Sequence, residues 1–99
     1  MRSGSQLRKE VLERVENYVC RDRMNAYGEA EDNFKDIADV WSWYLDRTVT
    51  SSQVAAMMAL MKIARLKYNP LHQDSSDDAV GYMTCYSGLV ALQSERDDA

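Results

Sequence analysis

The chain has 99 residues and a mass of 11.4 kDa, which is the size of one domain. Sixteen acidic residues against twelve basic residues give a net charge of −4 and a pI near 4.9. General binding of nucleic acid requires clustered positive charge, so this balance argues against that function. The longest apolar run, Val54–Met61, has eight residues and is too short to span a bilayer, so no membrane partner is expected.

No apolar segment follows the basic residues within positions 1–10, so the sequence predicts no secretory signal and a cytoplasmic location. Cys20 and Cys85 fit no metal-ligand spacing, and a reduced, buried role is favoured over a disulfide. A domain of this size forms a marginal core, so a homo-oligomer is expected.

Signals for turns are sparse, with one proline, Pro70, and four glycines in the chain. A β-sandwich needs turns about every 8–12 residues, and residue types that favour helix are abundant here. The sequence therefore predicts an all-α fold. We expect a compact bundle of about four helices in a single domain, 1–99, with a frayed tail at 94–99.

The first two helices are predicted at Ser5–Arg21 and Glu29–Leu45, separated by turn residues Asn25 and Gly28. Apolar residues recur at helical spacing in both segments: Leu7, Val11, Val15, Tyr18 and Val19, then Phe34, Ile37, Ala38, Trp41 and Leu45. An acidic stripe on the other side of the second helix predicts a solvated face, made of Glu29, Asp32, Asp36 and Asp39. Trp43 lies on that acidic side, which favours an oligomer contact.

The segment Thr50–Gln53 matches a capping box and predicts the start of the third helix. Val54–Met61 follows and is apolar on every side, which is typical of a buried central helix. This helix is expected to end before Asn69-Pro70. The fourth helix is predicted from about Asp74–Ser76, which offer cap residues, to about Gln93. Its apolar face consists of Ala79, Tyr82, Met83, Tyr86, Leu89 and Val90.

Two cations interrupt the predicted buried helix, and neither has an obvious wet face. Lys62 and Arg65 each need an anionic partner there, because an unpaired buried charge is strongly unfavourable. Asp78 borders the apolar stripe of the fourth helix and is the best candidate partner, whereas Asp77 points away from that stripe. The simplest interpretation of Asp78 is a structural salt bridge to one of the two cations.

Carboxylates on one helix face also suit a metal ion. Asp74 and Asp78 are one turn apart, so they can share a divalent cation or polarise a water. Glu31 and Asn33 flank the apolar face of the second helix and can complete an acidic and amide cluster. Asp74 is equally compatible with a helix cap. The single histidine, His72, is predicted to be a surface residue.

Other catalytic machinery is not evident in the sequence. It has no GxxxxGK[ST] loop, no HExxH, no CxxC and no GxSxG. Carboxylates with a divalent metal are therefore the only evident chemistry for an enzyme.

The order of several short motifs resembles a family of small phage and prophage proteins of uncharacterised function. The resemblance covers roughly residues 15–90. The motifs are Arg23-x-x-x-Tyr27-Gly28, Glu31-Asp32-Asn33-Phe34, Ile37-Ala38, Trp41, Val54-Ala55-Ala56-Met57-Met58, Lys62-Ile63-Ala64-Arg65 and Asp74-Ser75-Ser76-Asp77-Asp78-Ala79-Val80-Gly81-Tyr82.

That family in turn resembles the MazG-like all-α nucleoside triphosphate pyrophosphohydrolases, which are helical dimers or tetramers. The resemblance implies a Mg²⁺ site, with Mn²⁺ as an alternative, held by Glu31 or Asp32 and by Asp74 and Asp78. It implies that Lys62 and Arg65 face the phosphates or the metal cluster. The usual acidic motifs are E-x-x-E and E-x-x-D, and the corresponding spacings here are Glu29-x-x-Asp32 and Asp74-x-x-Asp77.

Three hypotheses of function follow. In the first, the chain is a Mg²⁺-dependent pyrophosphohydrolase in which Asp78 and Lys62 are catalytic. Its nucleotide-binding residues are Lys62, Arg65, Tyr27, Asn33 and Tyr82. In the second, the chain binds a nucleotide without cleaving it. In the third, it is a structural helical oligomer in which Asp78 forms only a salt bridge.

Overall fold

The computed structural model describes residues 1–22 and 29–98. Its elements are α1 (Gly4–Asn17), the π-helical turn η1 (Tyr18–Asp22), α3 (Ala30–Leu45), α4 (Ser51–Arg65) and α5 (Gln73–Asp98). Every regular element in these two ranges is helical, which confirms the predicted all-α class. The predicted turn at Asn25 and Gly28 lies outside the described residues.

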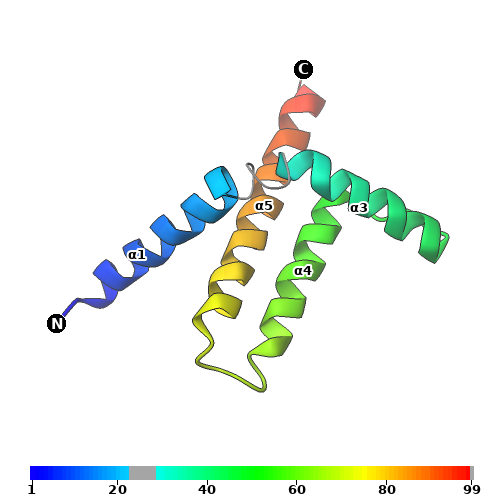
Figure 1. Ribbon diagram of the computed structural model, residues 1–99. Helices are drawn as coiled ribbons and strands as arrows, with labels where there is room; N and C mark the ends of the chain where they lie inside the picture. Colours follow the sequence, from blue (N-terminus) through cyan, green and yellow to red (C-terminus); the bar gives the residue numbers. More distant parts are fainter. Residues whose placement is uncertain (23–28, 99) are drawn as a thin grey trace.

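Helices α4 and α5 form an antiparallel hairpin at the centre of the molecule (Figure 1). Helix α3 packs on α4 and crosses the end of the hairpin where α4 begins, and α1 with η1 packs against α5. The outer ends of α1 and α3 extend away from the hairpin. The radius of gyration is 15.1 Å, compared with about 13 Å for a compact domain of this length, so the arrangement is more open than a compact bundle.

The hydrophobic core lies where α3 meets the hairpin. Phe34 and Ala38 of α3 pack against Val54 and Ala55 of α4, and all four residues are buried. Half-buried side chains of α5 complete this core: Tyr82, Cys85, Tyr86 and Leu89. The opposite end of the hairpin, where α4 ends and α5 begins, contributes none of these core residues.

Two helix boundaries differ from the sequence prediction. Helix α5 begins at Gln73, so Asp74 and the serines after it lie inside the first turn and are not N-cap residues. At its other end α5 continues to Asp98, past the predicted end near Gln93. Helix α4 ends at Arg65, and a short turn precedes Asn69-Pro70.

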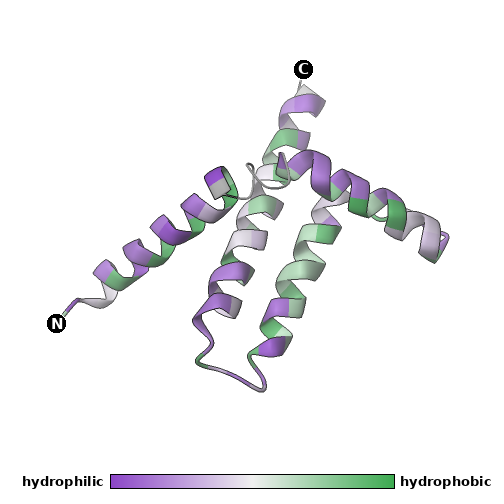
Figure 2. Ribbon diagram, in the orientation of Figure 1, coloured by the Kyte–Doolittle hydropathy of each residue, from purple (hydrophilic) through white to green (hydrophobic). Residues whose placement is uncertain are grey.

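The prediction that α4 is buried on every side is wrong. Only Val54, Ala55 and Ala59 are buried, because α3 and α5 cover one side of the helix. Ala56 and Met58 are half-buried, and four large apolar side chains of α4 are exposed: Met57, Leu60, Met61 and Ile63. Figure 2 shows that apolar residues occupy most of the length of this helix.

Neither Cys20 nor Cys85 forms a disulfide in the described part of the chain, and the predicted burial is wrong for Cys20, which is exposed. Cys85 is half-buried against the core. Across the described ranges, no helix combines the length and the hydropathy needed to cross a membrane.

The predicted capping box at the start of α4 is confirmed and gives a direct test. The Gln53 amide N–H donates to Thr50 Oγ1 at 3.2 Å, and the Thr50 N–H donates to Gln53 Oε1 at 2.9 Å. We expect Thr50→Ala to lower the free energy of unfolding by about 1 kcal/mol, because the backbone N–H of Gln53 loses its acceptor, the Thr50 hydroxyl oxygen. Urea denaturation measures this change. Ser51→Ala is the matched control, and an equal loss in both variants would contradict a role for the cap.

Candidate functional site

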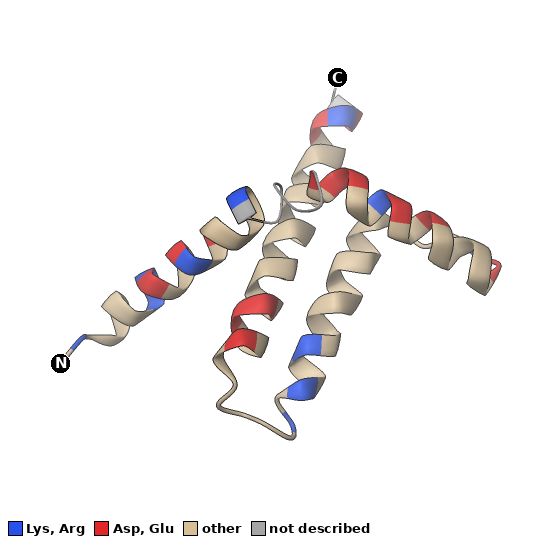
Figure 3. Cartoon of the chain, in the orientation of Figure 1, with Lys and Arg blue, Asp and Glu red and all other residues tan. Residues whose placement is uncertain are grey.

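A cluster of charged side chains lies at the end of the hairpin opposite the core. Lys62 Nζ lies 2.9 Å from Asp78 Oδ2, which confirms the ion pair predicted between α4 and α5. The Lys62 side chain is largely covered, and the Asp78 side chain is partly exposed. Arg65 follows Lys62 by nearly one turn and is exposed, so the expectation that it lacks a wet face is wrong. Figure 3 shows basic residues at the end of α4 facing acidic residues at the start of α5.

Asp74 lies one turn before Asp78 on α5 and is exposed. The two carboxylates and the two cations therefore share one end of the hairpin. Mg²⁺ is usually bound by one or two carboxylates together with water and substrate phosphate oxygens. Asp74 and Asp78 fit a Mg²⁺ ion that arrives with a phosphate-bearing ligand. A cage built from protein ligands alone is not formed, since no group of three or more His, Cys, Asp or Glu residues in 1–22 and 29–98 is arranged to hold a metal.

The four predicted metal ligands do not meet within one chain. Glu31 and Asp32 line a groove of about 540 Å³ at the opposite end of the hairpin, together with Leu89 of α5. Leu89 is eleven residues beyond Asp78, which corresponds to about 16 Å along a helix. Because α5 is one continuous helix, it separates the two acidic pairs, and the predicted single cluster is wrong. Glu31 and Asp32 instead lie in the first turn of α3, where carboxylates favour the helix dipole.

Of the other predicted binding residues, Asn33 lies on α3 and Tyr82 follows Asp78 by one turn on α5. Asn33 is half-buried near the start of α3. Tyr82 belongs to the core, and its ring lies 6.2 Å from the ring of Phe34 in an edge-to-face contact. Tyr27 lies outside the described residues.

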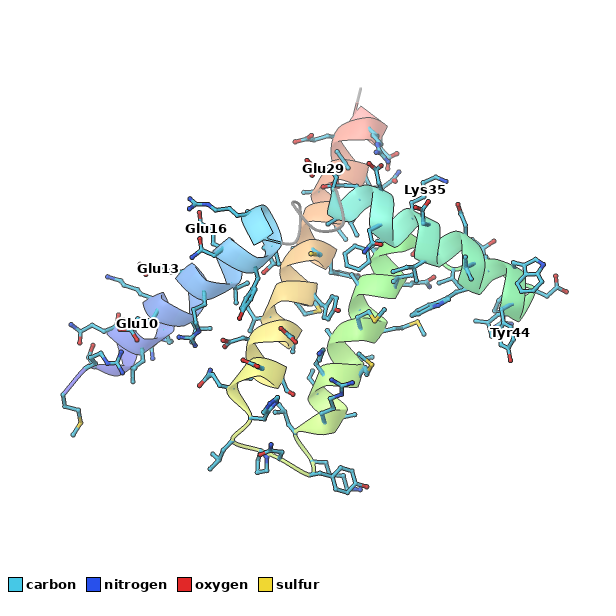
Figure 4. The ribbon with its side chains drawn as sticks, in the orientation of Figure 1. Glu10, Glu13, Glu16, Glu29, Lys35 and Tyr44 are labelled. Atoms are coloured by element: carbon cyan, nitrogen blue, oxygen red, sulfur yellow. The ribbon has the colours of Figure 1, made fainter. Side chains whose placement is uncertain are left out.

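The predicted solvated stripe on α3 is confirmed, since its four acidic side chains are exposed. Figure 4 shows Glu29 and Lys35 along α3 and Tyr44 at its far end. Trp43 is exposed next to Tyr44. His72 is exposed as predicted, and its Nδ1 lies 2.7 Å from the hydroxyl of the buried Ser75.

One ion pair, between the buried Asp77 and the partly exposed Arg14, was missed by the sequence analysis. Asp77 is 3% exposed, and its carboxylate accepts hydrogen bonds from Arg14 Nε at 2.9 Å and Arg14 Nη2 at 3.4 Å. Gln73 Nε2 donates a third hydrogen bond to it at 3.0 Å. Burial alone raises the pKa of Asp77, but the bonds from Arg14 and Gln73 and the charge of Arg14 outweigh it and lower that pKa. Asp77 therefore points away from α4, as predicted, but toward α1 and not toward solvent.

Next to the Arg14–Asp77 pair, α1 and η1 pack closely against α5 at Gly81. Gly81 is buried one turn after Asp77, and a Cβ atom at this position would lie 3.3 Å from Val19 of η1 and 3.9 Å from Val15 of α1. The absence of a side chain at Gly81 lets α1 and η1 lie directly against α5. Asp77 and Gly81 together define where the first helix docks.

Comparisons with known proteins are consistent with the phage resemblance. Residues 10–90 match a family described as "Domain of unknown function (DUF6378)". The chain belongs to the DUF6378 family. The Gene 55 protein of Mycobacterium phage D29 is 41% identical over 75 residues, which cover 76% of this chain and 50% of that protein. The Gene 55 protein of Mycobacterium phage L5 is 36% identical over 88 residues, which cover 87% of this chain and 56% of that protein.

The DUF6378 chain thus spans about half the length of the curated relatives it matches. No solved structure matches it. The predicted membership of an uncharacterised phage family is confirmed, and none of these matches involves a MazG-like protein.

The DUF6378 match contains both polar features of the structure, the charged end of the hairpin and the Arg14–Asp77 pair. A weak sequence signal marks the second feature. Gln73, Asp77 and Gly81 recur every fourth residue, so small and polar residues share one face of α5. This spacing indicates a docking face for another helix, although it does not identify Arg14 as the partner.

Proposed function

We propose that this DUF6378 protein is a Mg²⁺-dependent hydrolase that cleaves nucleoside or deoxynucleoside triphosphates to the monophosphate and pyrophosphate. The observation that carries the proposal is the charged end of the hairpin, where the Lys62–Asp78 pair lies beside Asp74 and Arg65. The resemblance of the motifs to MazG-like pyrophosphohydrolases supports this choice of reaction.

Each residue of the charged end has a role in this proposal. Asp74 and Asp78 hold the ion, and Mg²⁺, or Mn²⁺ in its place, supplies charge neutralisation and an activated water when bound. Lys62 and Arg65 bind phosphate oxygens. Both are cations, Lys62 contacts Asp78, and Arg65 follows Lys62 by nearly one turn of α4. Lys62 must release Asp78 to bind a phosphate oxygen. Only the lysine side chain has to move, because the phosphate would lie next to the metal-binding carboxylate of Asp78.

We further propose that the protein works as a homo-oligomer, a dimer or tetramer, in the cytoplasm of the bacterial host. The support is the set of large apolar side chains exposed on α3 and α4, which include Trp43, Tyr44 and Leu60. Large apolar side chains exposed in this number are typical of a protein that has an interface. The same surface favours a second candidate function, a structural helical oligomer in which the Lys62–Asp78 pair only fixes the hairpin.

A product assay tests the hydrolase. The purified protein is incubated with a panel of NTPs and dNTPs in Mg²⁺, Mn²⁺ or EDTA, and products are separated by ion-exchange chromatography. We expect metal-dependent monophosphate and pyrophosphate, and a rate lowered about 10–100-fold by Asp78→Asn, since a metal-site carboxylate is removed. Asp36→Asn, which removes an exposed carboxylate of α3, is the matched control and should keep the full rate.

Three outcomes separate the hypotheses. Hydrolysis that is equal in wild type and Asp78→Asn would refute the assigned site. Nucleotide binding measured by calorimetry without any product would favour a non-catalytic nucleotide-binding protein. Neither binding nor product from any nucleotide would favour the structural oligomer.

A further inference from the structure

The side of α4 that faces away from α3 and α5 is apolar, and no helix within residues 1–22 and 29–98 packs on it. Met57, Leu60, Met61 and Ile63 are exposed there, and Ala64 lies among them. No charged residue interrupts the helix between Val54 and Met61. On α5, Val80 and Met83 continue this surface, because they share a groove of about 540 Å³ with Ile63. We refer to the exposed side chains of residues 57, 60, 61, 63, 80 and 83 as the outer face.

The sequence along this face is close to a palindrome centred on Leu60. Met57 and Ile63 lie three residues before and after Leu60, and Ala56 and Ala64 lie four residues before and after it. These spacings place all five residues on one side of the helix. Two antiparallel copies related by a twofold axis beside Leu60 bring Met57 of each against Ile63 of the other. A self-complementary pattern of this kind is what a twofold interface requires.

The size of the face also fits a second copy. Its six large side chains are between 37% and 62% exposed. They present about 500 Å² of apolar surface per copy, so a pair buries about 1,000 Å², near the lower limit for a specific interface.

The charges near the two ends of α4 also favour an antiparallel pair of chains. Lys62 near the end of α4 is already paired with Asp78, but Arg65 and, just after the helix, Lys67 are exposed cations, whereas the start of α4 is crossed by the acidic helix α3 (Figure 3). In an antiparallel pair, Arg65 and Lys67 of each copy would lie toward the acidic α3 of the other. In a parallel pair, like charges lie side by side, so electrostatics favour the antiparallel arrangement.

We propose that two copies of the chain dock through the outer face of α4, antiparallel, with the twofold axis beside Leu60. Helices α4 and α5 of both copies then form an intermolecular four-helix bundle. This inference specifies the oligomer of the proposed function but does not depend on hydrolysis, because mass and cross-linking report it without any substrate.

Light scattering after size-exclusion chromatography tests the interface. We expect the wild type to have twice the 11.4 kDa mass of one chain. Leu60→Glu should have the mass of one chain and an unchanged helical circular dichroism signal, because two like charges would meet at the axis. Leu12→Glu is the matched control, since Leu12 of α1 is 61% exposed and Leu60 is 62% exposed. It should remain a dimer.

Cross-linking tests the register independently. In a Cys20→Ser, Cys85→Ala background, Leu60→Cys should form a covalent dimer under mild oxidation, and Leu12→Cys should not. A mixture of Met57→Cys and Ile63→Cys chains should cross-link more than either chain alone.

A monomeric wild type would overturn the proposal. A dimer that persists in Leu60→Glu would leave the oligomer standing but overturn this face as its interface. More cross-linking in Met57→Cys alone than in the mixture would overturn the antiparallel arrangement.

Discussion

Phe34→Ala is expected to lower the free energy of unfolding by about 3–5 kcal/mol, which is the range for removal of a buried phenylalanine ring. Phe34 is fully buried at the junction of α3 with the hairpin and contacts the ring of Tyr82 edge to face. Val54 is the other large side chain that is fully buried among the described residues. Few neighbouring side chains can therefore move into the cavity that the substitution leaves. The loss is a large share of the 5–15 kcal/mol that stabilises a typical domain.

Urea denaturation at one fixed chain concentration measures this effect, because the stability of an oligomer depends on concentration. Val40→Ala is the matched control on the same helix, since Val40 is 61% exposed. If the two variants lost stability equally, Phe34 would not be the anchor of the core.

Arg14→Met is expected to lower the melting temperature by several degrees at neutral pH, because the buried carboxylate of Asp77 loses its cation. Methionine retains much of the apolar stem of arginine, so the change mainly removes charge and hydrogen bonds. Gln73 still donates to Asp77, so the loss is partial. Arg8→Met, at an exposed position of α1, is the control and should leave the melting temperature unchanged.

The effect of Arg14→Met should depend on pH. The lowered pKa of Asp77 means that the folded chain holds its carboxylate ionised more readily than the unfolded chain does. The resulting stability is fully present above the ordinary aspartate pKa, about 4, and is lost as the pH falls through the lowered value. The difference in melting temperature between wild type and variant should therefore be largest near neutral pH and shrink below about pH 4. A difference that stays constant from pH 7 to pH 3 would contradict a role for the ionised pair.

Local sequence patterns were sufficient for the helices. Apolar spacing placed the stripe that contains Phe34 and Ala38, and the capping box located the start of α4 at Thr50. These features depend on residues three or four positions apart, so the chain alone specifies them. The Lys62–Asp78 pair was also predictable, because both residues border the faces on which two neighbouring helices meet.

Which side of each helix is covered could not be predicted in the same way. The all-apolar run of α4 was interpreted as a buried helix, but in the part of the chain that the structure describes only α3 and α5 pack on it, and its outer side is exposed. The spacing of apolar residues shows which of them share a face of the helix. Which faces other helices cover depends on the arrangement of the whole chain and of any second copy.

The sequence by itself determined the helices of this DUF6378 chain and predicted that Asp78 pairs with a cation of α4, since both depend on spacing along one or two helices; the structure selected Lys62 over Arg65 as the partner. Only the tertiary structure separated Glu31 and Asp32 from Asp74 and Asp78, because α5 is continuous and keeps its two ends apart. Only the tertiary structure, likewise, paired Arg14 with Asp77, residues 63 positions apart in the chain. That contact depends on how α1 packs against α5. Gly81 permits this packing because it has no side chain that would press against Val15 and Val19.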